Sequence, residues 1–177
     1  MAEFEQSPAT RTEMTERVAE LLRASFTPAN ALQQAQGVFS KSQIAERLAG
    51  TTDRKSKVYK AALRNVERWT TAAIERRKPS KAAQQKLVTL LQTDRQALAQ
   101  QFARGIQLHL DAIIAVGGNP KYSRRRTGII VDFNADESVS LLLHAQEDPD
   151  EAWQDFFDMY VMPAGTVENP RLRLEPR

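Results

Sequence analysis

Residues 39–91 decide how this chain folds, and they read FSKSQIAERLAG (39–50), TTDRKSKVYKAALRNVERWTTA (51–72) and AIERRKPSKAAQQKLVTLL (73–91). Ser40 and Gln43 have the spacing of a capping box, in which each side chain bonds the backbone N–H of the other residue at a helix start. Gly50 is a typical helix end, because glycine adopts the left-handed conformation without strain. This pattern predicts a short helix between Ser40 and Gly50.

Two further helices are predicted in the same stretch. The segment from about Arg54 to Thr71 contains neither Gly nor Pro, and its apolar residues recur on one helical face. The apolar residues that we expect this face to bury are Val58, Ala62, Val66 and Trp69. A third helix is expected after Pro79, with Ser80 as its N-terminal cap.

The stretch resembles the helix-turn-helix core of Cro/repressor-type (XRE-like) DNA-binding proteins, and the segments that carry the resemblance are SQIAERLAG (42–50) and NVERWTTAAIERRKPSKAAQQKLVTLL (65–91). In that family the recognition helix carries Val-x-x-Trp, and a loop of the Arg-Arg-x-Pro type follows. The resemblance implies a core between the two helices, formed by Ile44, Leu48, Val66 and Trp69. The turn in such motifs usually has about three to four residues. Here TTDRKSKVYKA separates Gly50 from Arg64, so either the second helix starts early or the loop is enlarged.

The whole chain also resembles the telomere-protecting terminal proteins of linear actinobacterial replicons. Its length, its basic helix-turn-helix pattern and its small β-containing C-terminal part carry this second resemblance. The resemblance implies a protein that binds replicon ends or caps them covalently through a Ser, Thr or Tyr hydroxyl. Tyr122 is the best-placed acceptor under that alternative.

Charge is distributed unevenly along the chain, although the net charge is only +3. Residues 53–81 contain ten Lys or Arg against three Asp or Glu, a net charge of +7. Residues 132–158 contain nine Asp or Glu and no Lys or Arg. Because like charges on one surface repel each other, the basic segment favours a polyanionic partner such as nucleic acid. The acidic segment favours an alternative in which the C-terminal part binds a protein partner, as an adaptor does.

Base contacts are predicted from the polar residues of the second helix, because Arg pairs well with guanine and Asn with adenine in the major groove. The residues predicted to contact bases are Arg64, Asn65, Arg68, Lys57 and Lys60. The residues predicted to contact phosphates are Ser40, Lys41, Arg54, Lys55, Arg76, Arg77, Lys78, Lys81, Arg124, Arg125 and Arg126. The expected partner is double-stranded DNA, and the expected state is a homodimer.

Four parts make up the predicted organisation, with the boundary before the last part at the Gly-Gly-Asn-Pro sequence 117–120. A helix over residues 12–25 is expected to open the DNA-binding domain. The connecting helix is expected from Asp94 to about Ala115, either as a core element or as a dimer seam. The predicted parts are residues 1–11 (disordered), 12–92 (helix-turn-helix domain), 93–117 (long connecting or dimerisation helix) and 118–177 (small α+β domain).

A β-β-α-β order is predicted for the C-terminal part. Residues 127–133 and 138–144 have the composition of two strands in a hairpin around a turn at 134–136. Asp148 and Pro149 are typical of a helix start, and residues 171–175 alternate as a last strand. The predicted fold class is therefore mainly α with a small α+β C-terminal unit.

Several function classes are disfavoured by the sequence. It contains no Gly-rich phosphate loop, no HExxH and no nucleophile elbow, so we expect neither an enzyme nor a cofactor. His109 and His144 lie in apolar contexts, and the acidic residues at 132–137 are typical of a turn, so no metal site is expected. The chain has no cysteine, no long apolar run and no secretory signal, which predicts a cytoplasmic, nucleoid-associated protein. The predicted role is repression of transcription or organisation of plasmid, phage or other replicon DNA.

Overall fold

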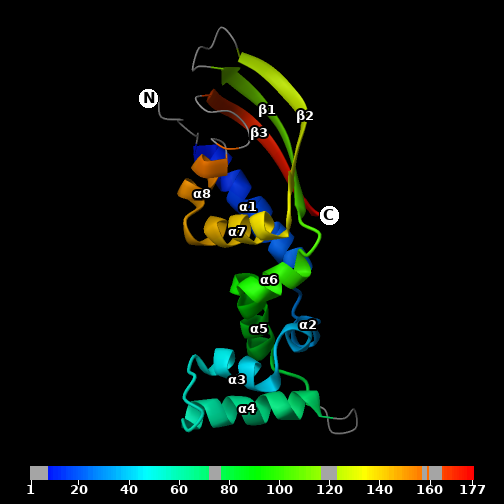
Figure 1. Cartoon of the computed structure of the whole chain (residues 1–177), viewed down its shortest axis with the longest axis vertical. Helices are drawn as coiled ribbons and strands as arrows, with labels where there is room; N and C mark the ends of the chain where they lie inside the picture. The colour runs from blue at the N-terminus through cyan, green and yellow to red at the C-terminus, as the bar shows by residue number, and fades with distance from the viewer. Residues whose placement is uncertain (1–7, 72–76, 117–122, 157–158, 160–164) are drawn as a thin grey trace. The chain divides into compact units, whose positions relative to one another are not determined.

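The computed structural model describes residues 8–71, 77–116, 123–156, 159 and 165–177. Within these ranges the chain forms eight helices and a three-stranded antiparallel sheet (Figure 1). A mainly helical chain with a small β-containing C-terminal part is therefore confirmed. Two compact units divide the chain, one made of residues 24–100 and the other of residues 1–23 with 101–177. Of the segment predicted to be disordered, residues 1–7 lie outside the described residues and residues 8–11 are helical.

The unit of residues 24–100 is helical. Its helices are α2 (Ala31–Val38), α3 (Lys41–Ala49), α4 (Lys57–Thr70), α5 (Lys81–Thr93) and α6 (Arg95–Gln101), the last of which ends at the unit boundary. Helix α3 contacts α2, α4 and α5. The fully or almost fully buried apolar residues of this unit include Phe26, Ala31, Ala35, Phe39, Ile44, Ala45, Tyr59, Val66, Leu87, Val88, Leu91, Ala97 and Leu98. Apart from α6, each of these helices therefore packs on a neighbour through a small set of apolar side chains.

Both ends of α3 follow the local sequence signals. The Ser40 hydroxyl accepts a hydrogen bond from the Gln43 N–H at 3.3 Å, and the Gln43 side chain accepts one from the Ser40 N–H at 2.9 Å. Gly50 ends the helix with a φ of 64°. Residues 50–56 then form a loop, and Ser56 caps α4 by accepting a hydrogen bond from the Tyr59 N–H at 3.1 Å. The second helix thus starts early, and the connection is also longer than a tight turn.

The buried face of α4 differs from the predicted one. Tyr59 is 4% exposed and Val66 is fully buried, whereas Val58 is 60% exposed. Ala62 and Trp69 are half-buried. The prediction that Val58 belongs to the buried stripe was wrong, because burying the Tyr59 ring removes more apolar surface from water than burying the smaller valine.

The second unit places helices against one face of a sheet. Its elements are α1 (Pro8–Ser25, up to Arg23 in this unit), β1 (Ile106–Val116), β2 (Ser123–Phe133), α7 (Ala135–Glu147), α8 (Pro149–Phe156) and β3 (Gly165–Pro176). The strand order is β2-β1-β3, and both pairings of the central strand are antiparallel. Figure 1 shows α1, α7 and α8 on the same side of the curved sheet. Ile106, Leu108 and Leu110 are fully buried while Gln107 and His109 are half-buried, so alternate side chains of β1 form the core under these helices.

The long helix predicted from Asp94 to about Ala115 was wrong. Helix α6 ends at Gln101, and β1 begins at Ile106. Gly105, with a φ of 89°, separates the two elements. Strand formation prevails because both neighbours of β1 supply a ladder of backbone hydrogen bonds. The helical dimer seam predicted there has no helix to form it.

The strand predicted over residues 138–144 was also wrong, since this segment lies in α7. Asn134, predicted to be part of a turn, caps α7: its side chain accepts from the Glu137 N–H, and the Glu137 carboxylate accepts from the Asn134 N–H, each at 2.9 Å. The strands predicted over 127–133 and 171–175 are confirmed within β2 and β3. So is the helix start at Asp148 and Pro149, where the Asp148 carboxylate accepts from the Glu151 N–H at 3.1 Å.

Helix α1 belongs with the sheet, whereas the sequence pattern places it with the DNA-binding domain. Arg11 lies 3.3 Å from the carboxylate of Asp150 in α8. Glu13 accepts a hydrogen bond from the backbone N–H of Leu172 in β3 at 3.3 Å. Among the described helices, none has the length and apolar composition that crossing a membrane requires.

Candidate nucleic-acid interface

One side of α4 packs on the protein and the other side is exposed. Tyr59 and Val66 mark the packed side. Because a helix turns by about 100° per residue, positions separated by four, seven and eleven residues lie on one stripe. The residues on the stripe opposite Tyr59 and Val66, called here the α4 stripe, are Lys57, Ala61, Arg64 and Arg68, and all four are exposed.

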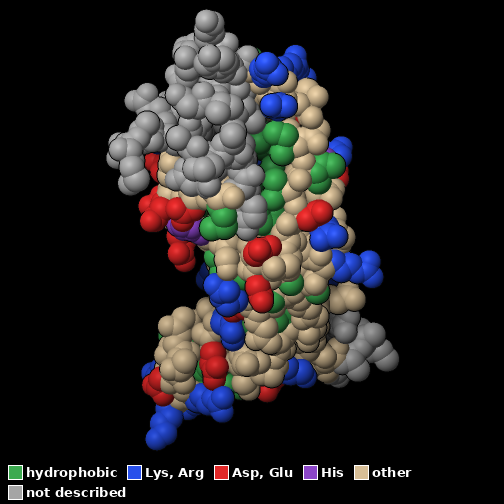
Figure 2. Space-filling view, turned by 45° about the horizontal axis from the view of Figure 1, so that its top comes forward, with side chains coloured by type: hydrophobic (Ala, Val, Ile, Leu, Met, Phe, Trp, Pro, Cys, Tyr) green, Lys and Arg blue, Asp and Glu red, His purple; other side chains and the backbone are tan. Residues whose placement is uncertain are grey.

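The other two residues predicted to contact bases flank the α4 stripe. Lys60 lies on one side of it and Asn65 on the other, and both are exposed. The structure therefore brings Lys57, Lys60, Arg64, Asn65 and Arg68 together on the exposed side of one helix. Figure 2 shows Lys and Arg side chains, with some Asp and Glu among them, at the surface in the lower part of the view.

The cations of the α4 stripe are not neutralised by the described part of the protein. Within the described ranges, none of Lys57, Arg64 and Arg68 forms an ion pair with another residue. Three positive charges thus lie along one face without a carboxylate partner. Such a face attracts an anion more strongly than a set of paired charges does.

Val58 and Ala61 are members of this exposed side that the sequence analysis missed. Val58 is 60% exposed, so its apolar side chain is accessible beside the charged residues of α4. Small apolar side chains contact the C5-methyl group of thymine in the major groove. A helical wheel drawn with Tyr59, and not Val58, at the centre of the buried side would have predicted that Val58 and Ala61 are exposed.

The residues predicted to contact phosphates near α3 have different surroundings. Lys41 and Lys55 are exposed. Arg54 is also exposed, but its guanidinium lies 3.1 Å from the carboxylate of Glu46 in α3. Ser40 uses its hydroxyl to cap α3. Lys41 and Lys55 are therefore freer to contact a phosphate than Arg54 or the Ser40 hydroxyl.

A second basic group precedes α5. Arg77, Lys78 and Lys81 are all exposed, and Lys81 is the first residue of α5. Arg76 lies outside the described residues. This group belongs to the same compact unit as the α4 stripe.

The arginines predicted near the domain boundary lie in the other unit. Arg124, Arg125 and Arg126 are exposed residues of β2. The structure does not group them in one compact unit with the α4 stripe. Tyr122 lies outside the described residues.

In the part of the chain that the structure describes, no group of three or more His, Asp or Glu side chains is arranged to hold a metal ion. The exposed side of α4, with the neighbouring residues predicted to contact phosphates, is thus the candidate site that agrees with the charge pattern of the sequence. Comparison of the chain with protein-family models, curated proteins and solved structures gave no match.

Proposed function

We propose that this chain binds double-stranded DNA sequence-specifically, with α3 and α4 acting as a helix-turn-helix and α4 as the recognition helix. The observation that carries the proposal is the α4 stripe, in which Lys57, Arg64 and Arg68 follow one another on the side of α4 opposite its buried residues. Helix α4 packs on α3 and buries Tyr59 and Val66, while the residues of the α4 stripe on its opposite side are exposed.

The dimensions of the helix suit the major groove of DNA. The groove is about 12 Å wide and admits one α-helix of about 10–12 Å diameter. Residues 57 and 68 are separated by about 16 Å along the helix axis, at about 1.5 Å per residue. That length spans roughly five base pairs at about 3.4 Å each. In this proposal Arg64 and Arg68 would bond guanine, Asn65 would bond adenine, and Val58 would contact a thymine methyl group.

Phosphate contacts would come from exposed cations on both sides of α4 in the sequence. Lys41 and Lys55 precede α4, while Arg77, Lys78 and Lys81 follow it. Contacts of this kind fix the register of the protein on the duplex without reading its sequence. The role that follows from such binding is repression of transcription or organisation of replicon DNA, carried out by a homodimer.

Selection of bound duplexes from a random library, using the full-length chain, tests this proposal. We expect enrichment of a defined motif, and a two-fold symmetric motif if the protein binds as a homodimer. If about six phosphates are neutralised, the logarithm of the binding constant should fall with the logarithm of the salt concentration at a slope of roughly −5.

The control is Lys86→Ala, which removes an exposed cation of α5 outside the α4 stripe. It should keep the motif, whereas Arg64→Ala with Arg68→Ala should lose it. A library that yields no motif, together with a salt slope near zero, rules out the proposal. A single unsymmetric motif rules out the homodimer and leaves DNA binding in place.

A further inference from the structure

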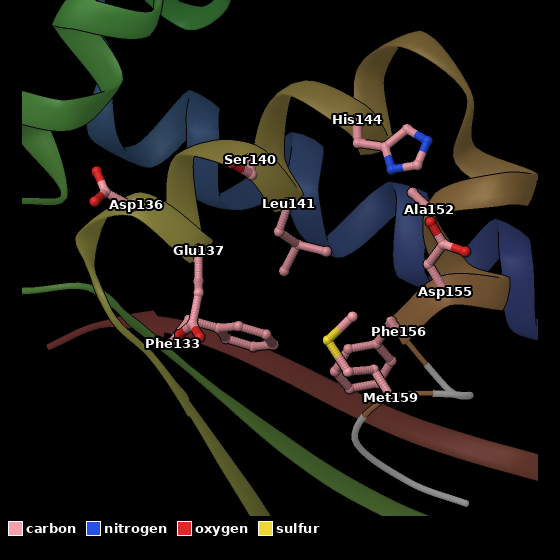
Figure 3. Close-up of a pocket in the computed structure, with 10 residues that line it drawn as sticks. All are labelled: Phe133, Asp136, Glu137, Ser140, Leu141, His144, Ala152, Asp155, Phe156 and Met159. Atoms are coloured by element: carbon pink, nitrogen blue, oxygen red, sulfur yellow. The ribbon is translucent and has the colours of Figure 1, made fainter. Parts of the chain in front are cut away.

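A groove opens between α7 and α8 beside the end of β2, in the unit that contains the sheet (Figure 3). Its volume is about 370 Å³. Phe133, Leu141 and Phe156 contribute apolar side chains to it, and Figure 3 shows them directed toward the same space. The rings of Phe133 and Phe156 lie 5.9 Å apart at an interplanar angle of 44°, so part of the lining is a packed aromatic pair.

Met159 adds an accessible apolar side chain to the groove. It is 71% exposed, which is the largest exposure among the large apolar residues of the described chain. A methionine is flexible and polarizable, so it adapts to the shape of an apolar partner side chain. The groove therefore offers a site for one or two apolar side chains from outside.

Carboxylates surround this apolar site. Asp136, Glu137 and Asp155 line the groove. His144 lies at one end of it, with its Nε2 3.4 Å from the carboxylate of Glu151. The segment 132–158, which supplies both helices, contains nine Asp or Glu and no Lys or Arg. A ligand that complements this acidic surface is therefore positively charged.

We propose that the groove binds a basic amphipathic helix of a partner protein. Apolar side chains on one face of that helix would enter between Leu141, Phe156 and Met159. Lysines or arginines beside them would pair with Asp136, Glu137 and Asp155. This is the helix-in-groove mode of recognition, in which apolar anchors supply affinity and charges select the partner.

The charge pattern also argues against two other occupants. Residues 1–7 of this chain, MAEFEQS, contain two glutamates and no Lys or Arg, so they do not complement an acidic surface. Nucleic acid is repelled for the same reason. The basic segment 53–81 of a second copy has the right charge and is the rival that the experiment must separate.

The test uses a fluorescein-labelled helical peptide of about fourteen residues, with leucines on one face and lysines elsewhere. Its binding to the full-length protein is followed by fluorescence anisotropy. Asp155→Lys should weaken binding by about tenfold, because it places a cation where the peptide is positive. Met159→Ser should weaken it by about fivefold through the loss of apolar contact. Both side chains are exposed, so neither variant disturbs the core.

The matched control is Glu147→Lys, which makes the same charge change at an exposed position of α7 that does not line the groove. It should change the affinity by less than about twofold. An equal loss in Glu147→Lys and Asp155→Lys overturns the proposal, since it shows attraction without a defined site. So does the absence of binding, or equal binding of a peptide in which glutamates replace the lysines. Concentration-dependent growth of the protein's mass in light scattering, abolished by Asp155→Lys, would show that a second copy is the occupant and would also overturn it.

Discussion

Arg47 and Asp94 connect the last turn of α3 to the start of α6, with the Arg47 Nε 3.1 Å from the Asp94 Oδ2. The other carboxylate oxygen of Asp94 accepts hydrogen bonds from the backbone N–H groups of Gln96 at 2.9 Å and Ala97 at 3.2 Å. The Arg47 guanidinium also lies 4.1 Å from the centre of the Phe39 ring. One partly buried carboxylate thus caps α6 and fixes α3, the helix on which α4 packs.

Removal of that carboxylate should destabilise the helical unit. For Asp94→Ala we expect a loss of about 2–3 kcal/mol in the free energy of unfolding, because both the cap and the ion pair disappear. Asp94→Asn is the matched control, since asparagine is an equally good helix cap. It should cost about 1 kcal/mol less than the alanine variant. Equal losses in urea denaturation would show that the cap contributes nothing.

The same substitution, valine to alanine, should reduce the stability of the protein much more at one position of α4 than at another. Val66→Ala removes two methyl groups from a fully buried site and should cost about 2 kcal/mol, including the cavity left behind. Val58→Ala acts on a side chain that is 60% exposed and should change the stability by less than about 0.5 kcal/mol. Thermal unfolding of the two variants measures the difference. Similar losses of stability in the two variants would show that Val58 is buried, as the sequence pattern predicts.

Of the four glycines whose surroundings the structure describes (Gly37, Gly50, Gly105 and Gly128), Gly105 is least able to accept a side chain. A Cβ atom there would lie 2.0 Å from the carbonyl oxygen of Phe133, and the backbone φ is 89°. Gly105→Ala should therefore cost roughly 3–5 kcal/mol through backbone strain and a clash with the main chain of β2. Gly128→Ala is the control, because its φ is 70° but nothing lies within 4 Å of its Cβ position. It should cost only about 1–2 kcal/mol, and an equal cost at the two sites would contradict the close approach at Gly105.

Single substitutions should distinguish residues that contact bases from residues that contact phosphates. Arg64→Ala or Arg68→Ala should cost about 1–3 kcal/mol on the selected DNA motif and little on random duplex. Lys78→Ala, in the exposed loop before α5, should weaken both kinds of DNA equally and flatten the salt slope by about one unit. Binding isotherms on both duplexes at several salt concentrations distinguish these effects. A uniform loss for Arg64→Ala and Arg68→Ala, with a loss of specificity for Lys57→Ala, would move the reading surface toward the start of α4.

Helix ends were predictable from the sequence because their signals are local. Ser40 with Gln43, Gly50, Ser80 and Asp148 each act through hydrogen bonds or backbone angles within a few residues. The exposed cations of α4 were predictable for the same reason, since a charged side chain on a helix seldom enters the core. The sequence did not predict which side of α4 is buried. Val58 and Tyr59 both fit a helical period, and only the packing on α3 selects between them.

The strand β1 could not be predicted in this way. Leu98, Phe102, Ile106 and Leu110 recur every four residues, as on a helix, whereas Ile106, Leu108 and Leu110 also alternate as on a strand. The choice depends on β2 and β3, which lie far along the chain. Helix α7 was missed for a different reason. Its Asn134 and Glu137 capping box was a local signal, but the apolar run SVSLLLH (138–144) indicated a strand. Trp69 was expected in the core but is half-buried, so its replacement by alanine should cost less than the roughly 3–5 kcal/mol typical of a buried aromatic.

The chain of residues 24–100 is inserted into a unit whose own residues come before and after it. The hydrogen bond between Glu13 and Leu172 closes a separation of 159 residues. On the ribosome, at roughly 5–20 residues per second, the inserted unit is complete several seconds before β3 is made. Through that interval α1 has no finished sheet on which to pack, so its apolar residues Met14 and Val18, which are buried in the native structure, lack their complete set of native contacts. The first helix of the sheet unit is therefore made early but reaches its contact with β3 only after β3 is made.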